Sequence, residues 1–145
     1  MFEPLGLFRT AADLPLGTWR WHPLITPEEV ACHGDGTILI VPDFLDLVLE
    51  LRKRCGFPFR FTSFYRSPAY NIQVAETGPD GPHTTGRAID LSLGGGQVIT
   101  LNKHAIDLGF TGFGYQQKGP YATRFVHLDK LPAGDGRMRP YVWSY

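Results

Sequence analysis

Residues 82–91 read Pro-His-Thr-Thr-Gly-Arg-Ala-Ile-Asp-Leu, which places a histidine in a polar, glycine-flanked loop and an aspartate seven residues later. The aspartate lies in a run typical of a β-strand, where successive side chains point to opposite faces. Asp90 therefore points away from an apolar face made by Ile89, Leu91 and Leu93. The pattern predicts an acidic side chain directed into a cleft, with the apolar face packed behind it.

A second run, residues 124–129, repeats this arrangement as Arg-Phe-Val-His-Leu-Asp. Val126 and Leu128 fall on one face, whereas His127 and Asp129 share the other face with Phe125. Each of the two strands has one apolar face and carries His or Asp on the opposite face. This pattern predicts a metal-binding surface on the polar face.

The composition is that of an ordinary globular domain. The chain has 145 residues, enough for one domain with a sizeable core. Its 14 basic and 14 acidic residues give a net charge near zero, so the basic footprint of a nucleic-acid-binding protein is absent. No membrane-spanning run and no signal-peptide pattern is visible in the sequence. Cys32 and Cys55 are expected to be free thiols, although the sequence leaves their pairing open.

Periodicity and cap residues predict a mixed α+β domain over residues 1–145, with 1–36 as an irregular N-terminal wrap and 37–145 as the core. Helices are expected from Thr26, from Asp43 as N-cap to Cys55, from Ser67 to Glu76 or Thr77, and over 97–108. Strands are expected over 37–41, 57–63, 112–115 and the two runs above, with one short strand within 13–21. The C-terminal residues are expected to form a loop and an aromatic tail.

His83, Asp90 and His127 together form a candidate ligand set for a catalytic zinc ion. Such sites use three protein ligands of the His or carboxylate type and leave a position open for water. Each residue alone would be explained as a solvent-exposed side chain, because single histidines in loops and single aspartates on strands are usually solvated. Their joint placement, on two strands and a loop of this pattern, favours metal binding.

From about residue 37 onward, the chain resembles the zinc-dependent D-alanyl-D-alanine peptidases, which act on peptidoglycan and share their fold with the hedgehog signalling domain. The matching motifs are Thr62 to Asn71 (TSFYRSPAYN), His83 to Asp90, Phe125 to Asp129 (FVHLD) and Val142 to Tyr145 (VWSY). They occur in the family's order. The resemblance implies a small, mostly antiparallel sheet with helices packed on it.

The resemblance also implies roles for individual residues. His83, Asp90 and His127 would bind zinc, and Arg66 would sit beside the metal, where its guanidinium suits a substrate carboxylate or an oxyanion. The alternative for Arg66 is a structural ion pair that caps the neighbouring helix. Tyr115 is expected to line the substrate cleft, with a packing role as the alternative.

The chain departs from the family pattern at one position. Many members carry an acidic residue three positions before the last histidine, where it serves as the general base, and this chain has Arg124 there. Asp129 is the nearest acidic alternative. It is expected to act either as the base or as a residue that orients a ligand histidine. Glu76 is a weaker candidate.

These inferences predict a zinc-dependent peptidase that hydrolyses amide bonds in peptidoglycan stem peptides next to a D-amino acid, as a carboxypeptidase or an endopeptidase. The alternative is a non-catalytic, zinc-stabilised module that binds the cell wall or belongs to a phage particle. We expect synthesis in the cytoplasm and action at the cell wall, as in a phage or prophage lysis enzyme. Neither nucleic acid nor membrane is expected as a partner, and the oligomeric state stays open.

Overall fold

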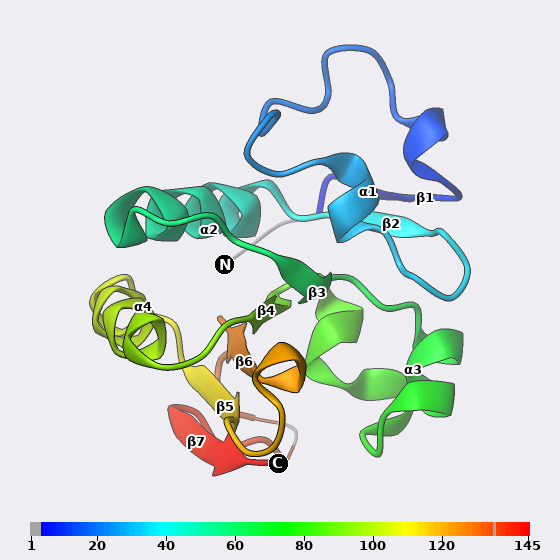
Figure 1. The fold of residues 1–145 in the computed structure, drawn as a ribbon. Helices are drawn as coiled ribbons and strands as arrows, with labels where there is room; N and C mark the ends of the chain where they lie inside the picture. The colour runs from blue at the N-terminus through cyan, green and yellow to red at the C-terminus, as the bar shows by residue number, and fades with distance from the viewer. Residues whose placement is uncertain (1–3, 135) are drawn as a thin grey trace.

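The computed structural model describes residues 4–134 and 136–145 (Figure 1). Its α-helices are α1 (Pro27–Val30), α2 (Pro42–Cys55), α3 (Pro68–Val74) and α4 (Gly96–Asp107). Its strands are β1 (Gly6–Phe8), β2 (Ile38–Ile40), β3 (Phe61–Ser63), β4 (Ala88–Ser92), β5 (Gly112–Gln116), β6 (Phe125–Asp129) and β7 (Tyr141–Ser144). Short 3-10 helices are η1 (Ala11–Asp13), η2 (Gly78–Asp80), η3 (Pro82–Thr85) and η4 (Tyr121–Thr123).

Five strands form the central sheet in the order β3-β4-β6-β5-β7. The pairs β3–β4, β4–β6 and β5–β6 are antiparallel, and β7 pairs with β5 in parallel. A separate antiparallel pair joins β1 to β2. The predicted α+β class and the mostly antiparallel sheet are therefore confirmed.

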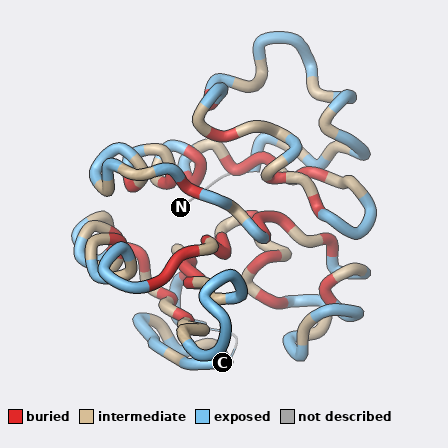
Figure 2. The backbone as a smooth tube through the Cα atoms, viewed as in Figure 1, coloured by how far each residue is buried: buried red, intermediate tan, exposed pale blue. Residues whose placement is uncertain are grey.

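One face of the central sheet is apolar and belongs to the core. Ile89 and Leu91 of β4 and Val126 and Leu128 of β6 are fully buried. They cluster with the buried residues of α2 and α4, two helices that also pack against each other (Figures 1 and 2). The opposite face of the same strands is thus left for the polar residues.

Local signals explain most helix ends. Pro42 begins α2, because its fixed backbone angle suits the first helical position, so the N-cap is Val41 and the predicted cap Asp43 lies in the first turn. Helix α2 ends at Cys55, as predicted, and Gly56 follows it in the left-handed conformation.

Ser67 is the N-cap of helix α3, as predicted, and its Oγ accepts a hydrogen bond from the Tyr70 N–H at 3.2 Å. It ends at Val74, before the predicted Glu76. The Asn71 side chain donates to Thr77 Oγ1 and to the Gly78 carbonyl oxygen, which turns the chain back towards the helix.

Two predicted strands and the predicted C-terminal loop differ in the structure. The strand expected within 13–21 is wrong, and the N-terminal strand is instead β1. The strand expected over 57–63 is confined to β3, which has two partners in β4 with a register shift between them. The C-terminal tail forms β7 rather than a loop, because β5 offers it a free edge that only the fold reveals.

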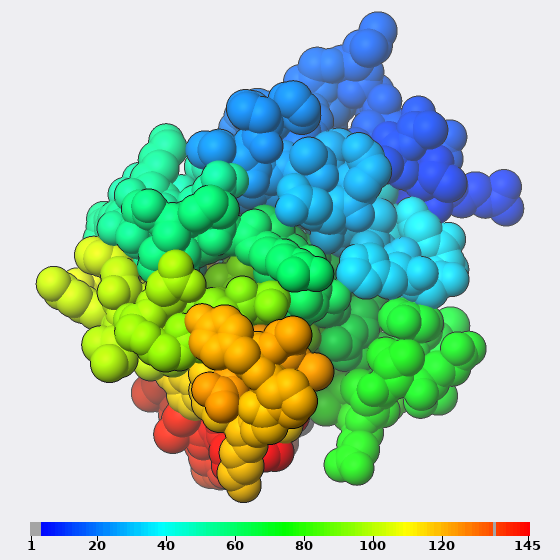
Figure 3. Space-filling view, viewed as in Figure 1, coloured from blue at the N-terminus to red at the C-terminus, as the bar shows by residue number. Residues whose placement is uncertain are grey.

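The N-terminal residues contribute to the core. Trp21, Ile25, Val30 and Cys32 are buried in the main hydrophobic cluster. In the space-filling view this segment (blue) lies directly against the region of β2 (cyan) (Figure 3). Among the described residues, no helix is long and apolar enough to cross a membrane.

Candidate metal centre

His83 is held in η3 with one ring nitrogen occupied. Its Nδ1 lies 2.7 Å from the Phe64 carbonyl oxygen, and its side chain is buried. A carbonyl oxygen only accepts hydrogen bonds, so Nδ1 carries the proton and donates it. This leaves Nε2, which lies 3.2 Å from Asp90 Oδ1, as the nitrogen that faces the site.

Asp90 and His127 face each other across neighbouring strands. They are direct partners in the β4–β6 register, and His127 Nδ1 lies 3.1 Å from Asp90 Oδ1. The other nitrogen of His127, Nε2, lies 2.8 Å from Asp129 Oδ2 and donates to that carboxylate. Nδ1 is therefore the nitrogen that His127 can offer to a ligand.

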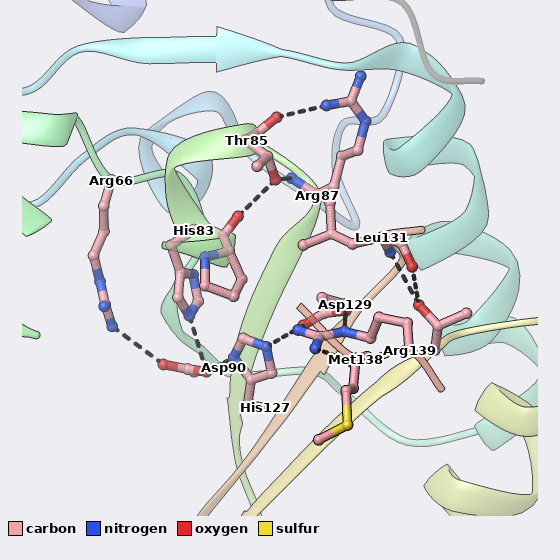
Figure 4. A network of polar contacts seen from close by, with 12 residues as sticks. Arg66, His83, Thr85, Arg87, Asp90, His127, Asp129, Leu131, Met138 and Arg139 are labelled. Atoms are coloured by element: carbon pink, nitrogen blue, oxygen red, sulfur yellow. Dashed lines mark hydrogen bonds and ion pairs between the residues drawn. The ribbon is translucent and has the colours of Figure 1, made fainter. Parts of the chain in front are cut away.

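These three side chains form one buried group, the His-Asp-His cluster of His83, Asp90 and His127 (Figure 4). Each offers one ligand atom, and these atoms lie within 4.8 Å of one another. Two imidazole nitrogens and a carboxylate oxygen suit a divalent transition-metal ion. The chemistry of the donors and their convergence thus fit a metal site.

The electrostatics of the cluster favour an ionised aspartate. Burial opposes ionisation of Asp90, but the neighbouring His83 and His127 outweigh it and hold its pKa far below the usual range. Burial lowers the pKa of His83. For His127, burial is outweighed by hydrogen bonds to Asp129 and Asp90, which raise its pKa. A metal ion at this site therefore competes with a proton on His127.

Asp129 lies behind His127 and is fully buried. Arg139 binds both of its oxygens, with Nε at 2.9 Å from Oδ1 and Nη2 at 2.8 Å from Oδ2. Burial alone would raise the pKa of Asp129, but His127 and Arg139 lower it. The carboxylate is thus an anion with every oxygen engaged by a cationic or N–H group.

Arg66 borders the cluster from the loop between β3 and α3. Its Nη2 lies 3.4 Å from Asp90 Oδ2, its Nε donates to Ser63 Oγ at 3.0 Å and its Nη1 to Asn71 Oδ1 at 3.1 Å. The side chain is 18% exposed. The guanidinium therefore lies beside the cluster and also contacts helix α3.

The family model for peptidoglycan L,D-endopeptidase MepK matches residues 35–136, more than half of the chain. The chain belongs to this family. The predicted relationship to peptidoglycan metallopeptidases is confirmed, and the protein is a peptidoglycan-cleaving metallopeptidase. Neither the comparison with curated proteins nor the comparison with solved structures gave a match.

Two residues that border the cluster of this peptidase were missed as site residues. Arg139 gives no signal in the sequence, because it is one of several cations in a segment expected to be loop. Trp143 lies in the quoted closing motif, and its ring centroid is 5.0 Å from that of His127. Both come from the C-terminal segment, which β7 anchors to the sheet.

Three other predicted residues lie away from the cluster. Tyr115 pairs with Val126 on the core face, where its hydroxyl donates to Asn102 Oδ1 at 2.8 Å, against the expectation that it lines the cleft. Arg124 donates to the Gly119 carbonyl oxygen and lies over the Tyr121 ring. Glu76 is exposed beyond the end of α3, and no hydrogen bond or ion pair among the described residues joins it to the cluster.

Proposed function

We propose that this protein is a zinc-dependent endopeptidase that hydrolyses amide bonds in peptidoglycan stem peptides next to a D-amino acid. The observation that carries the proposal is the convergence of three buried donor atoms in the His-Asp-His cluster of a chain of this family. Zinc is favoured over other metals because three His or carboxylate ligands with one open position are typical of catalytic zinc sites.

In this proposal His83 binds zinc through Nε2, His127 through Nδ1 and Asp90 through a carboxylate oxygen. The hydrogen bonds to the Phe64 carbonyl oxygen and to Asp129 support these assignments, because each occupies the opposite nitrogen of its histidine. When bound, the zinc ion supplies Lewis-acid activation of a water molecule and of the scissile carbonyl.

Arg66 is proposed to stabilise the negative charge that develops on the substrate. Each of its three nitrogens has one hydrogen-bond partner in the protein, and the two Nη atoms carry a second N–H each. These remaining donors, beside Asp90, suit an oxyanion or a peptide carboxylate. Its bonds to Ser63 and Asn71 hold the guanidinium ready for that role.

Asp129 is proposed to orient His127 rather than to act as the general base. Both of its oxygens accept from Arg139, and one also accepts from His127. A base needs a free oxygen within reach of the reacting water. The sequence left two roles open for Asp129, the general base and a residue that orients His127. Complete burial of the carboxylate and the engagement of both its oxygens favour the orienting role.

An endopeptidase is favoured over a carboxypeptidase because the description of the matching family names an endopeptidase. A non-catalytic wall-binding module is the second candidate. It is supported by Arg124, which stands where many members of the resembled peptidases carry their base and whose guanidinium is directed to the Gly119 carbonyl oxygen.

Digestion of purified, cross-linked peptidoglycan by the zinc-loaded protein tests the proposal. We expect cross-linked fragments to be converted into smaller muropeptides, and this product to disappear in His83→Ala but not in His33→Ala, which changes an exposed histidine. Release of a free terminal amino acid instead would identify a carboxypeptidase. Binding of zinc and peptidoglycan without any product would support the non-catalytic module.

A further inference from the structure

Beyond residue 136, where the family match ends, the C-terminal segment comes back to lie near the His-Asp-His cluster. Arg139 in this segment is almost buried, with a side chain 6% exposed. Its planar guanidinium pairs through Nε and Nη2 with the two oxygens of Asp129 (Figure 4). A fork of this kind fixes the carboxylate plane as well as its charge.

The fixed carboxylate in turn determines which nitrogen His127 presents. Asp129 Oδ2 accepts from His127 Nε2 at 2.8 Å, so that nitrogen must carry a proton. The Nδ1 of the same ring then faces Asp90 and His83, where the other donor atoms converge. Rotation of the Asp129 carboxylate would remove this constraint on the ring.

Trp143 contacts both His127 and Arg139. Its ring lies 5.0 Å from the His127 ring and 5.3 Å from Arg139 Cζ. Gly114 lies opposite both Trp143 and His127 in the sheet register, and a Cβ there would come within 2.6 Å of the indole. His127 thus contacts Asp129, Asp129 contacts Arg139, Arg139 contacts Trp143, and Trp143 contacts His127 again.

We propose that Arg139 is a positioning residue of the metal centre, which locks Asp129 so that His127 offers Nδ1 to the metal. The inference rests on the proposed function in one respect, namely that the His-Asp-His cluster binds zinc. It makes the C-terminal segment part of the metal site and not only an edge of the sheet.

Zinc affinity, measured by competition with a chromophoric chelator, tests the role of Arg139 without recourse to hydrolysis. Arg139→Gln should weaken zinc binding by about 10- to 100-fold, the usual cost of losing a group that orients a metal ligand. Arg139→Lys keeps the charge without the fork and should show an intermediate loss.

The chain offers a matched control for this change. Arg20 also pairs with a carboxylate, Asp46, at 3.0 and 2.8 Å, and lies 4.4 Å over a tryptophan ring, Trp21, but its side chain is 58% exposed. Arg20→Gln should leave zinc affinity within about twofold of wild type, since no ligand depends on that pair.

A double-mutant cycle separates positioning through Asp129 from a general loss of structure. If Arg139 acts through Asp129, the zinc affinities of Arg139→Gln, Asp129→Asn and the double variant should be strongly non-additive. Additive losses, or an Arg139→Gln variant that binds zinc as tightly as Arg20→Gln, would overturn the proposal. Absence of zinc binding in the wild type would instead overturn the proposed function.

Nuclear magnetic resonance of the zinc-loaded wild type gives a test that needs no folded variant. With ¹⁵N-labelled histidine, His127 should show a metal-bound Nδ1 and a protonated Nε2 whose hydrogen exchanges slowly with water. A His127 ring bound to zinc through Nε2 would contradict the inference directly.

Discussion

Asp129 shows how one residue's neighbours decide its chemistry. On the sequence it is simply the acidic residue closest to a candidate zinc ligand, and either a base or an orienting group is consistent with that position. In the fold it is buried between an imidazole and a guanidinium. Its role therefore depends on Arg139, whose position the strand pattern does not predict.

Asp129→Asn distinguishes the two roles. An amide has one accepting oxygen in place of the two carboxylate oxygens that accept from Arg139 and His127, so it cannot keep all of these hydrogen bonds. If Asp129 orients His127, zinc affinity and turnover should fall together, zinc affinity by about 10- to 100-fold. If it were the base alone, turnover would be lost while zinc affinity stayed at the wild-type value. Zinc titration and peptidoglycan digestion of the same preparation decide between these outcomes.

Gly112 makes room for the Asp129 carboxylate. The two residues are partners in the β5–β6 register, and a Cβ on Gly112 would overlap the carboxylate carbon and both oxygens. Gly112→Ala should therefore displace Asp129 and weaken zinc binding at least tenfold. Gly96→Ala is the control, since a Cβ at that first residue of α4 meets nothing within 4 Å and should leave zinc binding unchanged. Equal zinc affinity in the two variants would contradict this packing.

At the scale of elements, strand alternation was the most informative signal in the sequence. It correctly placed Asp90 on one face of β4 and His127 and Asp129 on one face of β6, because a half-buried strand has a period of two residues. Helices α2 and α4 followed from apolar spacing and glycine ends. Whether the three cluster residues bind metal stays a prediction.

The features of the fold that could not be predicted from the sequence depend on partners that are distant in the chain. β1 pairs with β2 across about thirty residues, and β7 pairs with β5 across a similar gap. Short strands of this kind gain their stability from the partner edge rather than from their own residues. For the same reason Tyr115, in an expected strand, could not be assigned to a face until β5 had its register.

The end of α2 allows a chemical prediction about Cys55. Burial raises the pKa of this thiol to about 11, and both Cys55 and Cys32 are free. Because the thiolate is the reactive form, alkylation of Cys55 by iodoacetamide at pH 8 should be roughly a hundredfold slower than that of an unperturbed thiol, and should rise about tenfold per pH unit up to pH 11. A rate that levels off near pH 9 would show that the thiol is not buried in this way. Mass spectrometry of the native and denatured protein supplies the rates and the reference.

At the scale of the whole molecule, the described residues before 37 (4–36) fold with the rest. Trp21 is 1% exposed within the main core and donates from Nε1 to Asp46 of α2 at 2.8 Å. We therefore propose that residues 4–36 are an integral part of one cooperative domain, and not a wrap that can be lost.

Trp21→Ala should reduce the free energy of unfolding by about 3–5 kcal/mol, as for other large residues removed from a core. Leu16→Ala is the control, because Leu16 is fully exposed, and it should change the free energy of unfolding by less than about 0.5 kcal/mol. Urea unfolding followed by fluorescence and by circular dichroism gives both values. Two separate transitions in the wild type would contradict the single cooperative domain.

The account as a whole depends on the His-Asp-His cluster being a zinc site. Elemental analysis of the protein, purified without chelators, measures this directly on the wild type, His83→Ala and His33→Ala. We predict one zinc ion per chain in the wild type and in His33→Ala, and loss of zinc in His83→Ala. A wild-type protein that holds no zinc when supplied with it, or a His83→Ala variant that binds zinc with the wild-type affinity, would contradict the account.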